Sequence, residues 1–352
     1  MIIYFVLIIL ILIIPNKKNN NIKYLLFCST ILIILICFRK QTIGYDLRHH
    51  YIINFYAYQQ LSWSELKSFG IEIGLPILSK LIGFISNKPQ IFIIVTGIIS
   101  ITLTIRFLYK YSPDFKMSLF LYCSYCTMYQ YMNQIAQALA VSIILLAFDF
   151  LKDKKYLKFI VLVLLASTFH SSALICILMI PLSNIKSIKF STFILITSTL
   201  ILLFFYNIIF ELSVNLLPQY SWYINSSKHG VGDTSRGVYL KILILLCGIL
   251  WTLYVTKKSE NIKPMHVICL TFSMVTLMFQ TITLKMIIMN RLGFYFLSFF
   301  FILIPTNLQS SCKNRNIIKL FIYCFMIVYY IYITIKWGDI SYGVTPYMFF
   351  WQ

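Results

Sequence analysis

The most densely polar stretch of the chain runs from Arg39 to Tyr51, between two apolar segments. Its sequence, Arg-Lys-Gln-Thr-Ile-Gly-Tyr-Asp-Leu-Arg-His-His-Tyr, contains three permanent cations, two histidines and one acid. Arginine offers a planar fork of donors for phosphate oxygens, and histidine can share or move protons near neutral pH. These residue types predict a site for an anionic head group. The alternative is an interfacial anchor whose long side chains extend towards lipid head groups.

Two ionisable residues that are distant in sequence are candidates for acid–base chemistry. Glu72 precedes the short apolar stretch 77–85, and His170 interrupts the longer apolar stretch 156–183. An isolated ionisable group near or within a bilayer is costly unless it is paired, and such groups are often functional. We therefore expect a cationic partner or a catalytic role for Glu72 and a functional role for His170. The alternatives are an exposed acid at a helix start and a histidine that packs or caps a helix.

Three side-chain amides lie at the end of the apolar stretch 117–131. Asn133 and Gln137 are four residues apart and therefore share one face of a helix, and Gln134 lies beside them. Amides of this kind bind the hydroxyl groups of sugars, but they also form hydrogen bonds between neighbouring membrane helices. The sequence leaves both interpretations open.

Metal and nucleotide chemistry are disfavoured by what the sequence lacks. The chain has only ten Asp and Glu, whereas a hard divalent cation needs several oxygen ligands. No Walker A loop, glycine-rich dinucleotide turn or His-Glu-x-x-His motif is present. We therefore predict no metal site and no cofactor, and the sequence disfavours ATP-driven transport and zinc proteolysis.

The composition dictates the kind of element that must position these residues. Of the 352 residues, 60% are hydrophobic and 11% are charged, whereas a soluble domain carries about 25% charged residues. Because backbone exposed to lipid must satisfy its own hydrogen bonds, we predict an all-α polytopic membrane protein. This excludes soluble enzymes, β-barrels and disordered chains. The net charge of +20 is scattered in short clusters between apolar blocks, so it does not indicate nucleic acid binding.

Hydrophobic patterning predicts about twelve membrane spans in one transmembrane domain that covers residues 1–352. The predicted inner segments are consistently basic if both termini lie outside. The outer side then has two long loops, 39–89 and 211–237, and a carboxyl-terminal tail, 336–352. The predicted spans are 1–14, 22–38, 90–108, 117–131, 135–151, 156–169, 171–183, 190–210, 238–255, 264–281, 290–306 and 318–335.

Several cations lie on the predicted outer side, against the usual orientation rule. Lys285 and Arg291 flank a short outer turn, and Arg236 lies at the end of the second long loop. An anionic substrate that arrives from the outer leaflet would explain them. The alternative is a solvated loop.

Several short motifs occur in a fixed order over nearly the whole chain. They are Arg39…Gly44-Tyr45-Asp46…Tyr51, Glu72-x-Gly74, Met132-Asn-Gln-Ile-x-Gln-Ala-Leu-Ala140, Phe169-His170-x-Ser-Ala-Leu, Arg291…Tyr295-Phe296 and Trp337…Pro346-Tyr347. Their order resembles that of the EpsG family. Members of that family are bacterial inner-membrane proteins of exopolysaccharide, capsule and O-antigen clusters, and many act as Wzy-type polymerases.

The resemblance implies a GT-C-like fold and a metal-independent glycosyl transfer at the periplasmic face. The donor would be a growing glycan on undecaprenyl diphosphate, and the acceptor would be the non-reducing end of a lipid-linked repeat unit. Partners would be this oligosaccharide, membrane lipid and a chain-length regulator protein. The implied roles are diphosphate binding by Arg39, Arg48, Arg291 and Lys285, acid–base catalysis by Asp46, Glu72 or His170, and glycan binding by His49, Tyr51, Gln134, Gln137 and Arg236.

One departure limits the transfer of roles from the family. EpsG-family sequences usually carry an arginine where this chain has Ala136. If that arginine binds diphosphate, this protein is impaired or altered, or it uses another cation. A flippase or transporter of lipid-linked oligosaccharide is the main alternative, and a membrane acyltransferase is a weaker one. A flippase is expected to have charged residues along the whole depth of its spans, whereas the candidates here gather at the predicted outer ends.

Overall fold

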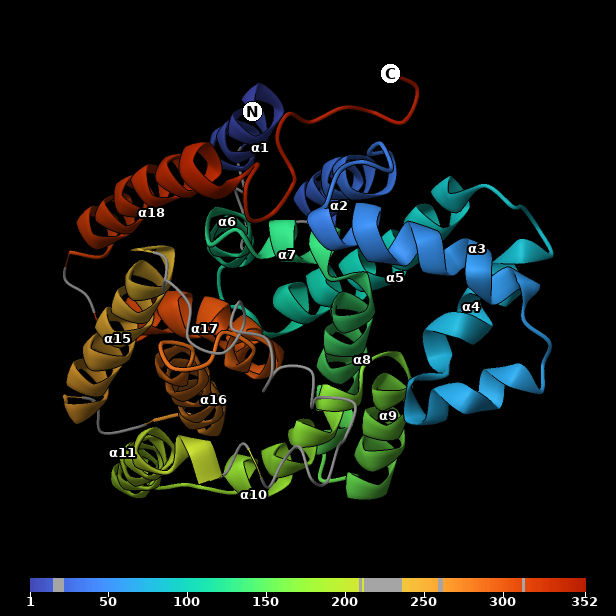
Figure 1. Cartoon of the computed structure of the whole chain (residues 1–352). Helices are drawn as coiled ribbons and strands as arrows, with labels where there is room; N and C mark the ends of the chain where they lie inside the picture. Colours follow the sequence, from blue (N-terminus) through green and yellow to red (C-terminus); the bar gives the residue numbers. More distant parts are fainter. Residues whose placement is uncertain (15–21, 209–210, 212–235, 259–261, 312–313) are drawn as a thin grey trace. The chain divides into compact units, whose positions relative to one another are not determined.

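The computed structural model describes residues 1–14, 22–208, 211, 236–258, 262–311 and 314–352. The regular structure in these residues is helical, apart from one isolated bridge between Arg39 and Phe349 (Figure 1). A helix is present at each of the predicted spans, which confirms an all-helical, multi-pass membrane protein. The predicted loop 211–237 falls almost wholly outside the described residues.

Six helices in the described part of the chain are long and apolar enough to cross a membrane. They are α5 (Pro89–Tyr111), α8 (Ile135–Lys152), α15 (Arg236–Lys257), α16 (Pro264–Ile282), α17 (Met289–Ser311) and α18 (Arg315–Trp337). The other apolar helices are shorter, among them α1 (Ile2–Ile13), α2 (Ile22–Cys37), α9 (Tyr156–Phe169) and α11 (Ile188–Phe204). The count of about twelve spans and the GT-C-like architecture therefore stay predictions.

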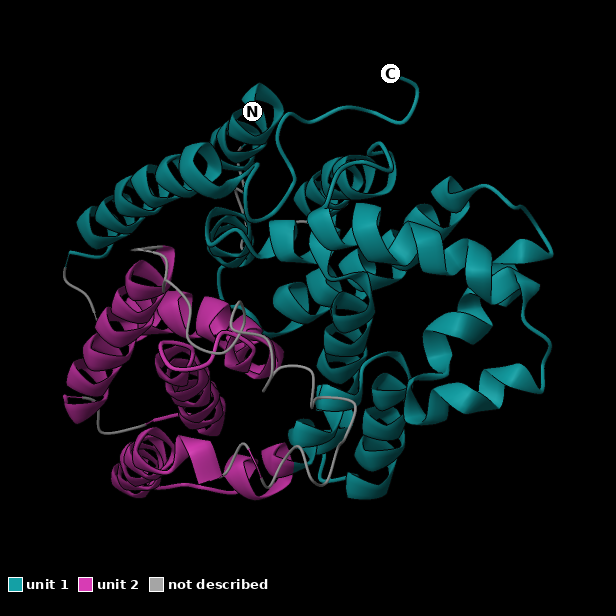
Figure 2. Ribbon diagram, in the orientation of Figure 1, with its two compact units in different colours: residues 1–177, 312–352 teal, residues 178–311 magenta. Residues whose placement is uncertain are grey.

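The described chain divides into two compact units (Figure 2). Unit 1 contains residues 1–177 and 312–352, so its last helix returns to the amino-terminal helices. Unit 2 contains residues 178–311, and its described helices are α10 (Met179–Ser183), α11, α15, α16 and α17. Whether the two units act as the single transmembrane domain expected from the sequence stays a prediction.

The predicted outer loop 39–89 is itself largely helical. It contains a π-helical turn, η1 (Leu47–Tyr51), which leads directly into α3 (Ile52–Gln60). A 3-10 helix, η2 (Glu65–Glu72), and α4 (Gly74–Gly83) follow, and α4 packs against α3 (Figure 1). The short apolar stretch 77–85 of the sequence corresponds mostly to α4. This segment thus forms a small helical layer of unit 1.

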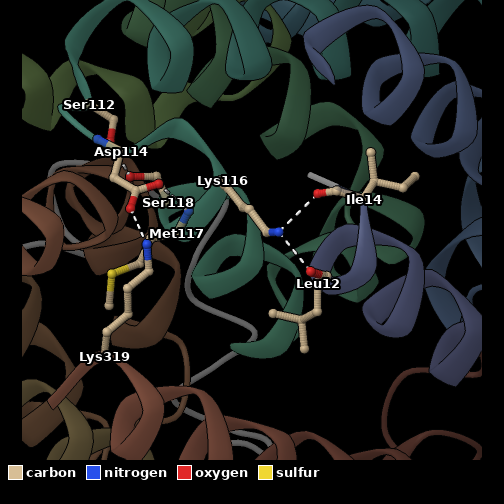
Figure 3. Close-up of polar contacts among 8 residues, drawn as sticks. All are labelled: Leu12, Ile14, Ser112, Asp114, Lys116, Met117, Ser118 and Lys319. Carbon is tan, nitrogen blue, oxygen red and sulfur yellow. Dashed lines mark hydrogen bonds and ion pairs between the residues drawn. The ribbon is translucent and has the colours of Figure 1, made fainter. Parts of the chain in front are cut away.

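A cluster of charged side chains joins three helices at one end of unit 1 (Figure 3). The Lys116 ammonium, at the start of α6 (Phe115–Ser124), donates to the carbonyl oxygens of Leu12 and Ile14 at 2.6 and 2.9 Å. A cation is favourable there because the last carbonyls of α1 have no partner within that helix. Asp114 caps α6 by accepting from the Met117 N–H and also pairs with Lys319 of α18. These contacts connect α1, α6 and α18.

Replacement of Asp114 by Asn should lower the free energy of unfolding by about 2 kcal/mol, because the partly buried Lys319 ammonium loses its counter-charge. Thermal or denaturant unfolding of the purified protein in detergent measures the change. The matched control is Asp153→Asn, whose partner Lys155 is exposed, and we expect a change below about 1 kcal/mol there. Equal effects of the two variants would contradict the structural role of Asp114.

Candidate functional site

The Arg39 side chain is buried and joins three parts of the backbone. Its Nε donates to the Ile43 carbonyl at 3.2 Å, one Nη donates to Ile36 in the last turn of α2, and the other donates to Met132 at 3.0 Å. Met132 lies in the last turn of α7 (Thr127–Asn133), so the guanidinium satisfies carbonyls at two helix ends. Burial lowers the pKa of Arg39 to about 10, which leaves the group protonated at neutral pH.

These bonds change the role expected for Arg39. Its side chain is 1% exposed, and its donors are directed at backbone carbonyls. The prediction that Arg39 binds a diphosphate directly does not fit this environment, because a ligand would have to displace carbonyls that close two helix ends. The structure instead makes Arg39 a residue that shapes the turn after α2.

The same turn is held by backbone contacts from other segments. Gln90 of α5 donates to the carbonyls of Cys37 and Arg39. The carboxyl-terminal tail runs alongside, where the Gly44 N–H donates to the Gly343 carbonyl at 2.8 Å. Gly44 has a φ of +111°, and a β-carbon there would lie 2.5 Å from the Met132 carbonyl oxygen. Only glycine suits this position, which explains the Gly-Tyr-Asp sequence.

A group of exposed basic side chains follows this turn, and we call Arg48, His49 and His50 the basic turn. The Asp46 N–H donates to the Asn133 side-chain oxygen at 2.6 Å, which fixes the start of η1 against α7. The π-helical η1 then presents Arg48, His49 and His50 at the surface. Such turns are costly relative to an α-helix and are often found at functional sites.

The other two acid–base candidates, Glu72 and His170, lie together. A carboxylate oxygen of Glu72 accepts the Ser171 N–H at 2.8 Å and lies 3.5 Å from Nδ1 of His170. Ser172 Oγ also lies 3.3 Å from this ring nitrogen. The close approach depends on Gly74, where a β-carbon would lie 2.5 Å from the Thr168 hydroxyl. The start of α4 can therefore contact the end of α9, and η3 (Ser171–Leu178) follows.

The environment of Glu72 keeps its carboxyl group ionised. Burial by itself would raise the pKa, but hydrogen bonds from His170 and Ser171 outweigh burial and hold the pKa of Glu72 at about 2. A carboxylate with so low a pKa is a poor general base near neutral pH, because efficient bases have a pKa near the working pH. It is well suited to hold a proton on the neighbouring Nδ1 of His170.

One buried apolar cluster links these candidates within unit 1. It contains Leu47 and Tyr51 beside the basic turn, Leu75 shortly after Glu72, and Ile135 and Ala136 at the start of α8. Phe169, next to His170, packs against it. The full buried cluster is Leu47, Tyr51, Phe55, Leu75, Ile82, Phe92, Ile93, Ile135, Ala136 and Leu139. The basic turn and the Glu72–His170 pair are therefore positioned by the same packing.

Two residues expected to bind glycan are instead buried. Tyr51 is 9% exposed within the apolar cluster, and Gln137 is 1% exposed on α8. Their surroundings make them packing residues, in line with the structural alternative for the amide group. Gln134 is partly buried at the start of α8, and His49 is exposed in the basic turn. A glycan-binding role for these two stays a prediction.

The remaining predicted cations belong to unit 2. Lys285 is exposed, with its ammonium 5.9 Å from the centroid of the Tyr206 ring, and Arg291 is partly buried near the start of α17. Arg236 begins α15, but its side chain lies outside the described residues. Lys241 of α15 is not among the predicted site residues, and its side chain is only 8% exposed. The sequence feature that could have identified Lys241 is its position inside an apolar helix.

Two polar residues of α3 were also missed. Asn54 and Tyr58 follow His50 at intervals of four residues, which places all three on one side of the helix. The four-residue spacing is present in the sequence, but it indicates a shared helix face only if the segment is helical, and this segment was expected to be a loop.

Replacement of Arg39 by Lys should lower the free energy of unfolding by about 3 kcal/mol, because the donors of an ammonium all sit on one nitrogen and cannot reach the carbonyls that the guanidinium contacts through three nitrogens. Thermal unfolding in detergent gives the comparison. Arg48→Lys is the matched control, since Arg48 is exposed, and we expect a change within about 0.5 kcal/mol. An unchanged Arg39→Lys protein would contradict the structural role.

Comparison with known protein families gives a match over most of the chain. The model of the EpsG family matches residues 22–349. The matched range includes the turn at Arg39, the Glu72–His170 pair and the tail that contacts Gly44. No curated protein and no solved structure matches the chain.

Proposed function

The chain belongs to the EpsG family of polysaccharide polymerase-type membrane proteins, and from this we propose that it elongates a glycan on a lipid carrier. In this proposal, a growing glycan moves from undecaprenyl diphosphate to the non-reducing end of a lipid-linked repeat unit. The reaction takes place at the periplasmic face of the bacterial inner membrane. The observation that supports the proposal is the Glu72–His170 pair, which the apolar cluster holds together with the basic turn.

His170 is the general base in the proposed reaction. Glu72 and Ser172 both lie near Nδ1 and hold the proton there, so Nε2 is the nitrogen that accepts a proton from substrate. The acceptor hydroxyl gives its proton to Nε2 as its oxygen bonds to the anomeric carbon of the donor sugar. This division of roles resembles that of a carboxylate that orients a catalytic histidine in other enzymes.

The basic turn stabilises the leaving group in the same proposal. The bond between the anomeric carbon and the phosphate oxygen breaks, and negative charge grows on undecaprenyl diphosphate. The Arg48 guanidinium can form two parallel hydrogen bonds to phosphate oxygens, and His49 and His50 lie beside it. Arg291 and Lys285 of unit 2 are proposed as further cations for the diphosphate. No metal ion is needed for this scheme, because fixed cations supply the charge.

Replacement of His170 by Gln should reduce polymer formation by about 100-fold or more, which is the usual contribution of a general base. Glu72→Gln should have an effect in the same direction, because it removes the charge that holds the Nδ1 proton. A polysaccharide ladder on a gel measures the product at equal protein level. Glu65→Gln in the same helix η2 is the matched control, because Glu65 is exposed and accepts from Ser62. Normal ladders from His170→Gln and Glu72→Gln would contradict the assignment.

Replacement of Arg48 by Ala, and separately of Arg291 by Ala, should abolish polymer while protein level stays normal. Both variants remove a cation proposed to stabilise the departing diphosphate. The ladder assay should also follow single repeat units on the outer side of the membrane. They should persist in these variants, since a polymerase acts after the units have crossed. Their loss would favour a flippase, and normal ladders from both variants would refute the diphosphate role.

A further inference from the structure

A row of polar side chains on α3 connects the basic turn with Glu72. The Asn54 amide nitrogen lies 3.1 Å from Nε2 of His50, the last histidine of the basic turn. One helical turn further on, the Tyr58 hydroxyl is within hydrogen-bonding reach of the Asn54 amide. The row therefore begins at the basic turn and extends along α3 by one side chain per turn.

The far end of the row lies against the segment that carries Glu72. The ring of Tyr58 meets the ring of Phe69 edge to face, with centroids 5.2 Å apart. Phe69 and Glu72 both belong to η2, so this contact holds Tyr58 against the segment that carries Glu72. Burial and the negative charge of Glu72 both raise the pKa of the Tyr58 hydroxyl, which therefore stays neutral.

The charges along this surface differ between its ends. The basic turn offers Arg48 and two histidines, whereas the Tyr58 end is bounded by the Glu72 carboxylate. A diphosphate is attracted to the first end and repelled from the second. Neutral amide and phenol groups suit a neutral ligand rich in hydroxyls, since they donate and accept hydrogen bonds.

We propose that Asn54 and Tyr58 form a binding site for a neutral saccharide, the acceptor sugar whose hydroxyl reacts beside His170. The inference rests on the proposed function and assigns the acceptor to the row on α3 and the donor diphosphate to the basic turn. Asn54 and Tyr58 contact the sugar by hydrogen bonds, and the proton transfer itself stays with His170. A sugar bound along the row lies between the two charged groups that the reaction needs.

Binding of the delipidated sugar tests the inference without catalysis. The probe is the repeat-unit oligosaccharide released by mild acid hydrolysis from lipid-linked units of polymerase-deficient cells. Titration into the full-length protein in lipid nanodiscs should show binding that weakens about tenfold in Tyr58→Phe and in Asn54→Ala, since loss of one hydrogen bond has about this effect. Arg48→Ala should bind this probe like the wild type, because the probe has no diphosphate.

Tyr56→Phe is the matched control, because Tyr56 is an exposed tyrosine of the same helix. It should bind the oligosaccharide and elongate polymer like the wild type. Should Tyr58→Phe fail to fold, Asn54→Ala alone decides the outcome. Wild-type binding and elongation by both variants would overturn the inference and leave the polymerase proposal standing. Weakened oligosaccharide binding in both variants, with no polymer from the wild type in vitro, would support the sugar site and contradict the polymerase.

Discussion

The candidate site depends on one buried cation. Arg39 is almost completely enclosed, and a charged group is stable there only if its donors are satisfied. Backbone carbonyls from α2, from the following turn and from α7 supply the acceptors. Because two of these segments are far apart in sequence, the guanidinium fixes the turn that precedes Arg48 against the end of α7. The direction in which the basic turn leaves the helical core follows from this constraint.

The second constraint is the contact between Gly74 and the end of α9. It brings Glu72 to the first N–H of η3 and to the His170 ring. The carboxylate is thereby held ionised, with its pKa at about 2, and one of its oxygens lies 3.5 Å from Nδ1 of His170. The buried cluster around Leu75 and Ala136 then relates this pair to the basic turn. In the proposed chemistry, proton transfer and stabilisation of the leaving group need these two regions at once.

Much of the helical layout was predictable, and the reasons for the exceptions are physical. Long apolar stretches such as α5 and α8 indicate helices by hydropathy alone. The helices α3 and α4 were not expected as a layer because their pattern is mixed, and their packing depends on contacts with distant segments. Arg39 was expected to bind a diphosphate because the sequence shows the charge of this side chain but not its burial. Glu72 and His170 were both named from sequence, whereas their pairing across almost a hundred residues appears only in the fold. Ala136 lies in the apolar cluster, and the described members of that cluster include no cation.

Reconstitution of the purified protein is the sharpest test of whether the chain elongates a lipid-linked glycan. The purified protein would be placed in proteoliposomes with lipid-linked repeat units and a metal chelator, and glycan length and free undecaprenyl diphosphate would be measured together. If the chain is a polymerase, we expect longer glycans, with one undecaprenyl diphosphate released for each repeat unit joined. Movement of repeat units across the bilayer without elongation or release of the carrier would contradict it.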